Sequence, residues 1–150
     1  MSTTRRALLI AAASLPLASH AATLPRALDL QRELTAALAQ HQPLVVMVSL
    51  DGCAYCHLVR DHHLAPMHQQ HGLPVVQIDM RSRRALKNVD GRPIVHDEFV
   101  RGRRVTVAPT VLFLGPKGEE LAERLVGGSI PDFYGAYLEQ RLEQARAGLR

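Results

Sequence analysis

The chain contains two cysteines, Cys53 and Cys56, and they directly follow a strand-like segment. That segment, residues 44–50, is a nearly continuous apolar run, which is typical of a strand covered on both faces of a sheet. Asp51-Gly52 interrupts the run, and apolar residues at helical spacing resume from Cys53 onward. Cysteines so close in sequence cannot close a large loop, so they make a poor structural disulfide. We therefore expect a reactive cysteine pair at the point where a buried strand passes into a helix.

The remaining segments alternate between helical and strand-like patterns. Apolar residues recur at helical spacing over residues 29–40, 53–70 and from Ser129 onward. Pro66 is expected to kink or shorten the second helix, and Ser129 to cap the last one. Further strand-like runs occupy residues 73–80, 110–114 and 120–126. The sequence therefore predicts an α/β fold with a mixed central sheet of about four strands flanked by helices.

A basic segment, residues 81–104, lies between the second and third predicted strands. It contains eight Lys or Arg residues and three acidic ones. We predict one or two short helices here, with a turn at Asp90-Gly91, so that a helical insert precedes the final hairpin. Such a charge cluster is either a solvated face or a docking surface for acidic partners.

The first 21 residues have the pattern of an export signal. Arg5 and Arg6 precede an apolar run, and Ser19-His20-Ala21 places small residues where a signal peptidase cleaves. Cleavage after Ala21 would divide the chain into a signal peptide, residues 1–21, and one domain, residues 22–150. Residues 4–9 also resemble a twin-arginine signal, so the Sec and twin-arginine routes both stay open. The expected location is the periplasm.

Charge and hydropathy narrow the range of partners. Without Arg5 and Arg6, basic and acidic residues nearly balance, which argues against a nucleic-acid partner. The chain has no run of about eighteen apolar residues, so we expect no stable membrane insertion. A length of 150 residues suits one domain, and we expect a monomer.

The position of the cysteines at a helix start determines their expected chemistry. The first N–H groups of a helix lack partners and its dipole is positive there, so a negative charge is stabilised. A cysteine at this place becomes a thiolate more readily than an ordinary one. We predict Cys53, nearer the surface, as the attacking sulfur. Cys56, three residues further and on the same face, is predicted to be buried and to resolve the mixed disulfide.

In four features, the chain resembles a thioredoxin. They are the strand before Cys53, the Cys-x-x-Cys pair at a helix start, Ala108-Pro109-Thr110 before a hairpin, and Gly127-Gly128 before the last helix. The resemblance covers about residues 28–147. It implies that Ala108 and Pro109 are joined by a cis peptide bond facing the sulfurs and bind a substrate chain by backbone hydrogen bonds. It further implies an oxidoreductase that reduces protein disulfides, takes electrons from a membrane thiol–disulfide donor, and uses the Cys53–Cys56 disulfide without a cofactor or metal.

Several positions depart from the usual thioredoxin pattern. Gly52 stands where thioredoxins usually carry Trp, and Ala54-Tyr55 separates the cysteines. Met47 replaces the buried acid of the preceding strand, and the position of its lysine partner falls near Val75, so that proton relay is expected to be missing. The segment after the cysteine pair is also longer. With the closing residues 131–138, these features resemble the exported SoxW-like group linked with sulfur oxidation.

Other residues near the cysteines have smaller predicted roles. Tyr55 is expected to contact a substrate, and His57 either tunes the pair or simply faces solvent. Asp51 either opposes thiolate formation or assists proton transfer. Four histidines after the cysteine pair suggest a metal site: His62, His63, His68 and His71. His63, Met67 and His71 share a face at helical spacing, but Pro66 disrupts that geometry, so we expect surface histidines and no metal site.

Two other interpretations of the cysteine pair stay open. The sequence from Cys53 to His57 satisfies Cys-x-x-Cys-His, in which both sulfurs bind haem and the histidine ligates iron. However, c-type cytochromes are mostly helical and do not place this motif directly after a strand. In the second interpretation, a copper-carrying thioredoxin relative binds the metal through Cys53, Cys56 and a distant histidine.

Overall fold

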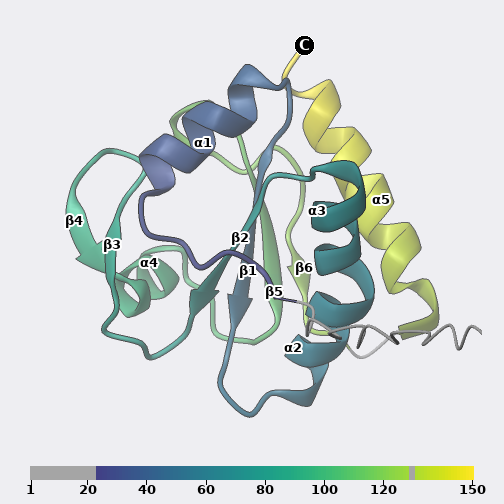
Figure 1. The fold of residues 1–150 in the computed structure, drawn as a ribbon, viewed down its shortest axis with the longest axis horizontal. Coiled ribbons are helices and arrows are strands. Elements are labelled where there is room, and N and C mark those ends of the chain that lie inside the picture. The colour runs from purple at the N-terminus through teal and green to yellow at the C-terminus, as the bar shows by residue number, and fades with distance from the viewer. Residues whose placement is uncertain (1–22, 129–130) are drawn as a thin grey trace, which may run out of the picture.

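A four-stranded mixed sheet forms the centre of the molecule in the computed structural model, which describes residues 23–128 and 131–150 (Figure 1). The strand order is β2-β1-β5-β6, with β1 (Leu44–Ser49) parallel to β2 (Val75–Asp79) and antiparallel to β5 (Thr110–Leu114). The short edge strand β6 (Leu125–Val126) pairs antiparallel with β5. The predicted mixed sheet is thereby confirmed. The predicted signal peptide and the predicted cap Ser129 lie outside the described residues.

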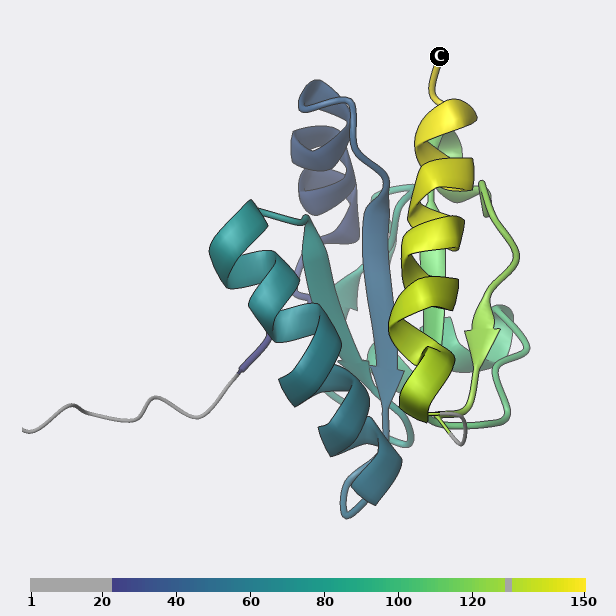
Figure 2. The same cartoon turned by 90° about the vertical axis from the view of Figure 1, so that its right-hand side faces the viewer.

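Helices pack on both faces of this sheet (Figures 1 and 2). One face carries α1 (Leu30–Ala39) and α4 (His96–Gly102), and the other carries α2 (Ala54–Val59), α3 (Ala65–His71) and α5 (Pro131–Ala147). None of the helices in the two described ranges is long and apolar enough to cross a membrane.

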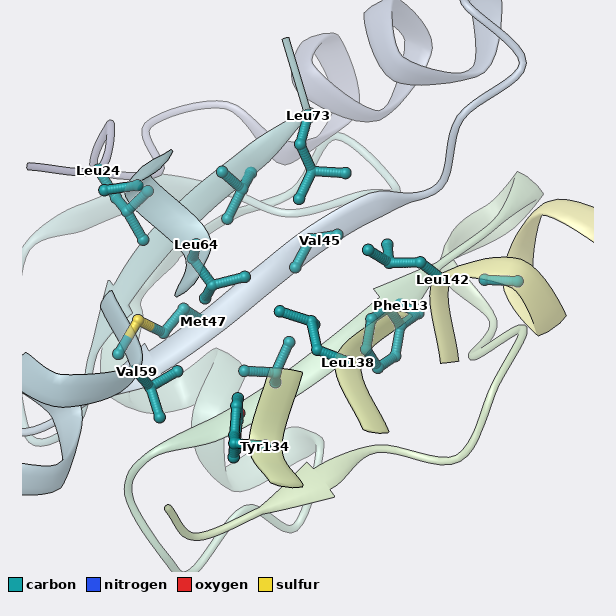
Figure 3. Packing of buried hydrophobic residues seen from close by; sticks show 14 of the residues in the cluster. Leu24, Val45, Met47, Val59, Leu64, Leu73, Phe113, Tyr134, Leu138 and Leu142 are labelled. Atoms are coloured by element: carbon teal, nitrogen blue, oxygen red, sulfur yellow. The ribbon is translucent and has the colours of Figure 1, made fainter. Parts of the chain in front are cut away.

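Alternate residues of the central strand β1 serve two separate hydrophobic clusters. Val45 and Met47 pack towards α5, in the cluster drawn in Figure 3, whereas Val46 and Val48 pack towards α1. All six residues of β1 are buried. Each such aliphatic side chain stabilises the fold by about 1.5–3 kcal/mol relative to an exposed one. The strand that leads into the cysteine pair is therefore anchored on both faces.

The helical segment after the cysteines is interrupted before Pro66. A π-helical turn, η1 (Arg60–Leu64), joins α2 to α3, and the N–H of Ala65 donates to the carbonyl of Arg60, five residues back. Proline has no N–H to donate to the carbonyl four residues earlier, so a regular helix cannot continue unchanged through this position. The disturbance predicted at Pro66 is present, as one wide turn rather than a break.

The basic segment differs from its prediction, because strands as well as a helix occupy it. A hairpin of β3 (Ala85–Lys87) and β4 (Pro93–Val95) precedes α4. The predicted turn at Asp90-Gly91 is present, and Gly91 has a φ of 85° that favours glycine. The prediction of a helix over these residues was wrong, because Pro93 and the left-handed conformation of Gly91 favour a turn between two strands.

The final hairpin and helix lie close to their predicted positions. A short 3-10 turn, η2 (Pro116–Gly118), follows β5, and regular pairing of the return strand is limited to β6. The predicted apolar face of the last helix is confirmed, since Tyr134, Leu138 and Leu142 of α5 are buried.

Candidate active site

The two cysteines lie where β1 ends and α2 begins. A disulfide joins Cys53 to Cys56, with their Cα atoms 5.2 Å apart. Cys53 caps α2, because its Sγ accepts a hydrogen bond of 3.1 Å from the N–H of Cys56. Cys53 is partly exposed, whereas Cys56 is 1% exposed. The sulfur at the helix start is therefore the one that a second molecule can reach.

The Ala108–Pro109 segment forms one wall beside Cys53. Its peptide bond is cis, and the carbonyl oxygen of Ala108 lies 3.7 Å from the Sγ of Cys53. The segment is fixed on both sides: the N–H of Gly127 donates to the Pro109 carbonyl at 2.7 Å, and the hydroxyl of Thr110 donates to the Val107 carbonyl at 2.7 Å. The structure thus brings both residues of the predicted wall to the cysteine pair.

Gly128 approaches the site closely and was not among the predicted site residues. A Cβ atom built there would lie 3.2 Å from Val59, 3.3 Å from Tyr55 and 3.4 Å from Pro109. A larger residue would have to push these side chains apart, so glycine lets the backbone at Gly128 lie close to the active-site helix. The double glycine before the last helix was the sequence signal that could have identified this contact.

The floor beneath Cys56 is apolar. Cys56 belongs to the same buried cluster as Met47, Val59 and Tyr134; the last three are labelled in Figure 3. Met47 is fully buried, and no Asp or Glu is among the buried polar residues of the described part of the chain. The buried hydroxyl of Tyr134 has no hydrogen-bond partner there, and burial raises its pKa well above the usual range for tyrosine.

The predicted neighbours of the pair occupy different places. Tyr55 is 51% exposed beside the cysteines, where a partner can contact it. The side chain of His57 faces Arg60, whose guanidinium donates to its Nδ1. The exposed carboxylate of Asp51 accepts a 3.1 Å hydrogen bond from the N–H of Gly52. In the described part of the chain, neither the His57 nor the Asp51 side chain hydrogen-bonds a cysteine; both line an adjacent cleft.

The histidines are dispersed over the helical segment. The ring of His63 packs against Tyr134 with centroids 5.1 Å apart, and His68 donates from Nδ1 to the Leu73 carbonyl at 2.8 Å. Across residues 23–128 and 131–150, no three His, Cys, Asp or Glu side chains gather as a metal site would require. The strand before the Cys-x-x-Cys-His motif also differs from the mostly helical setting of c-type haem.

This arrangement of a capping cysteine, a buried second cysteine and a facing proline wall is that of a thiol–disulfide oxidoreductase. Comparison with known families gives the same class. The chain belongs to the thioredoxin-like domain family, whose sequence model matches residues 30–142. No curated protein matches the sequence.

Solved structures share the fold at low sequence identity. A thioredoxin from Nicotiana alata is 19% identical with a TM-score of 0.54, covering 85% of this chain and 99% of its own. An oxidoreductase named DsbH is 17% identical with a TM-score of 0.54, covering 91% and 95%. Mitochondrial thioredoxin 3 from Saccharomyces cerevisiae is 18% identical with a TM-score of 0.50, covering 80% and 93%. These likenesses confirm the thioredoxin fold.

Proposed function

We propose that this protein is an exported thiol–disulfide oxidoreductase that reduces disulfides in other proteins. One observation carries the proposal: Cys53 is partly exposed, its Sγ caps α2 and lies beside the Ala108 carbonyl, and Cys56 is buried. The first sulfur is open to a substrate and the second is protected from one. That division suits an attacking and a resolving cysteine.

In the first step, the reduced Cys53 thiolate attacks one sulfur of the substrate disulfide. A bond forms between Cys53 and that sulfur, and the substrate's own S–S bond breaks and releases a thiolate. The N–H of Cys56, 3.1 Å from the Cys53 sulfur, stabilises negative charge on it. The position of Cys53 at the N-terminus of α2 also stabilises negative charge on its sulfur.

In the second step, the Cys56 thiolate attacks the Cys53 sulfur. The Cys53–Cys56 bond forms, the mixed disulfide breaks, and the second substrate thiolate leaves. Two electrons pass from the protein's dithiol to the substrate, and the protein reaches the disulfide form seen in the structure. Because the floor beneath Cys56 is apolar, the Cys56 proton has to pass to solvent or to the leaving thiolate.

Exposed apolar side chains next to the wall favour a protein substrate. Val107 precedes the wall and is 44% exposed, while Val126 precedes Gly127 and is 59% exposed. Both lie beside the wall, since Val107 directly precedes Ala108 and Val126 is paired with Thr110, while the exposed Tyr55 lies between the two cysteines in sequence. Exposed apolar residues that gather around a reactive group are typical of a surface that binds another chain.

The compartment, partners and direction of electron flow are parts of the same proposal. The signal-like residues 1–21 support a periplasmic location, where a reductant needs electrons from a membrane thiol–disulfide donor. The exchange chemistry requires no cofactor beyond the two sulfurs. The long segment after the cysteine pair and the closing residues 131–138 support a SoxW-like type.

The exchange chemistry is tested by reduction of insulin with dithiothreitol as the electron source. We expect the wild-type protein to accelerate the reaction and Cys53→Ser to abolish the acceleration. Cys56→Ser is the matched variant: it should lose turnover but accumulate a stable mixed disulfide through Cys53, detectable by mass spectrometry. Unchanged insulin reduction by Cys53→Ser would overturn the assignment of the nucleophile.

Direction and location need separate measurements. Equilibration with glutathione buffers gives the reduction potential, where about 30 mV corresponds to a tenfold change for this two-electron couple. A potential well above that of the glutathione pool would indicate an oxidant instead. Intact mass of protein from a periplasmic fraction should show a chain beginning at Ala22.

A further inference from the structure

A polar cleft opens beside the cysteine pair, away from the Ala108–Pro109 wall. Its volume is about 740 Å³, and it is lined by the turn that precedes Cys53 and by residues 79–82 after β2. In the sheet, β2 and β5 lie on opposite sides of β1. The cleft and the proline wall therefore lie on opposite sides of the strand that leads to Cys53.

Gly52 leaves the mouth of this cleft unobstructed. Its φ of +69° favours glycine, and a Cβ atom built there would meet nothing within 4 Å. A 2.8 Å hydrogen bond from the Met80 N–H to the Ser49 carbonyl joins the ends of β1 and β2 at the cleft. The residue next to Cys53 therefore places no side chain at this end of the cleft.

Three arginines line the cleft together with two aspartates, Asp51 and Asp79. Arg26 forms an ion pair of 3.3 Å with Asp79, and Arg60 forms one of 2.9 Å with Asp61. Arg81 is exposed on the cleft and forms no ion pair within the described residues. Positive charge in the cleft is thus only partly balanced by the protein itself.

Five basic side chains of residues 81–104 have no ion pair among the described residues: Arg81, Arg83 and Arg84 at the start, next to the cleft, and Arg103 and Arg104 at the end. Arg83 and Arg84 follow directly after the cleft residue Ser82, are exposed, and likewise have no ion pair in the described part of the chain. Between these two ends, basic side chains are paired with acids: Lys87 with Asp29, Arg92 with Asp90, and Arg101 with Asp97.

The acidic groups of the cleft do not cancel this charge. Asp79 is engaged by Arg26 and by the amide of Gln77, which donates to it at 2.7 Å. Asp51 lies on the rim nearest Cys53 and would repel an anion there. An anionic group is therefore expected at the Arg81 side of the cleft, away from Asp51.

We propose that this cleft binds acidic side chains of the partner protein next to its disulfide, so that the enzyme prefers disulfides flanked by Asp or Glu. The inference rests on the proposed exchange function and adds a specificity for the partner. A substrate chain lying along Ala108–Pro109 extends past Cys53 into the cleft. Opposite charges at such a surface mainly raise the association rate and select partners, and they weaken with salt.

The test uses two disulfide peptides that differ only in three residues on one side of a cysteine, Glu in one and Gln in the other. We expect kcat/KM to favour the Glu peptide by about five- to tenfold at low salt, and the preference to shrink at high salt. Arg81→Glu should abolish or reverse this preference. Arg104→Glu is the matched control, because Arg104 is also exposed, unpaired among the described residues and at a similar φ of 53°, but does not line the cleft.

The outcomes separate this inference from the function on which it rests. No turnover of either peptide would overturn the exchange function itself. Equal turnover of both peptides, or equal loss of preference in Arg81→Glu and Arg104→Glu, would overturn the cleft. Oxidised glutathione is the third substrate: if Arg81→Glu slows its reduction while the two peptides stay equal, the cleft binds a small anionic thiol and the proposed protein partner is wrong.

Discussion

Cys53 lies between two surfaces of opposite character. On the β5 side, Pro109 and Gly128 pack tightly around the active-site helix, over an apolar floor that contains Met47. On the β2 side, Gly52 lies at a cleft whose lining includes three arginines and two aspartates. The first surface consists of packed groups that tolerate little change, whereas the second consists of solvated charges. We infer that the packed side holds the reacting cysteines in position, whereas the charged residues outside the core select among partners.

The largest effect on the apolar side is expected from a charge introduced into the floor beneath Cys56. Met47→Asp would bury a carboxylate among side chains that cannot pair with it, and we expect the free energy of unfolding to fall by about 3 kcal/mol or more. Met47→Leu preserves the volume and should cost less than about 1.5 kcal/mol. Urea denaturation of the oxidised proteins gives both values. A Met47→Asp variant as stable as wild type would show that the floor has a partner for the charge.

A smaller effect is expected from a Cβ atom added at the closely packed Gly128. Gly128→Ala introduces a Cβ into contacts of 3.2 to 3.4 Å, so we expect a loss of about 1–3 kcal/mol in stability and slower insulin reduction. Gly102→Ala is the control, since a Cβ at Gly102 meets nothing within 4 Å, and this variant should be neutral or slightly more stable. Thermal unfolding and insulin turbidity measure the two effects. If the two variants have the same stability and activity, the side chains around Gly128 make room for a Cβ atom without cost.

The exposed part of the apolar side is tested by Tyr55→Ala. Truncating this 51% exposed side chain should lower kcat/KM for insulin by about three- to tenfold without reducing stability, because tyrosine at an interface contributes contact area at small entropic cost. Leu28→Ala, which removes a 60% exposed side chain remote from the cysteines, should have no effect on turnover. If both variants keep full activity, substrate binding does not use Tyr55.

The smallest expected effect concerns pH and His63. Burial, and secondarily the charge of His62, lowers the pKa of His63 in the folded protein below its ordinary value. Between the folded and unfolded pKa values the unfolded chain binds more protons. The contribution of His63 to stability is therefore complete above the unfolded pKa and is lost as pH falls through the folded one. His63→Gln should flatten this decline in urea midpoints measured from pH 8 to pH 5, relative to the exposed control His41→Asn. An unchanged slope would exclude His63 as its source.

The sequence predicted the sheet well because each long strand lies in a mostly apolar run, in which Gln77 and Asp79 of β2 are the main exceptions. Residues 44–50, 73–80 and 110–114 predicted β1, β2 and β5 to within about two residues at each end. The hairpin of β3 and β4 was missed, since only Leu86 of β3 is buried and its alternation is too short to distinguish from a helix.

Only those residues of the candidate site that belong to a sequence motif could be predicted. Cys53, Cys56 and Pro109 carry motifs that can be read along the chain, and the structure brings them together. The cleft was not predictable, because Arg26, Gly52 and Arg81 line it together only through tertiary packing. Gly128 likewise matters through what surrounds it.

The wide turn between α2 and α3 sets the rotational phase of the second helix relative to the first. Each residue of an α-helix advances by about 100°, so deleting one residue from Arg60–Leu64 would turn everything beyond it by roughly that angle. Ala65, now fully buried, would rotate towards solvent. The wide turn holds one residue more than a regular helical turn. If this helix is aligned without a gap to a regular α-helix, the wrong side chains are paired from Ala65 onward. A chimera joined at this position would carry the same misalignment.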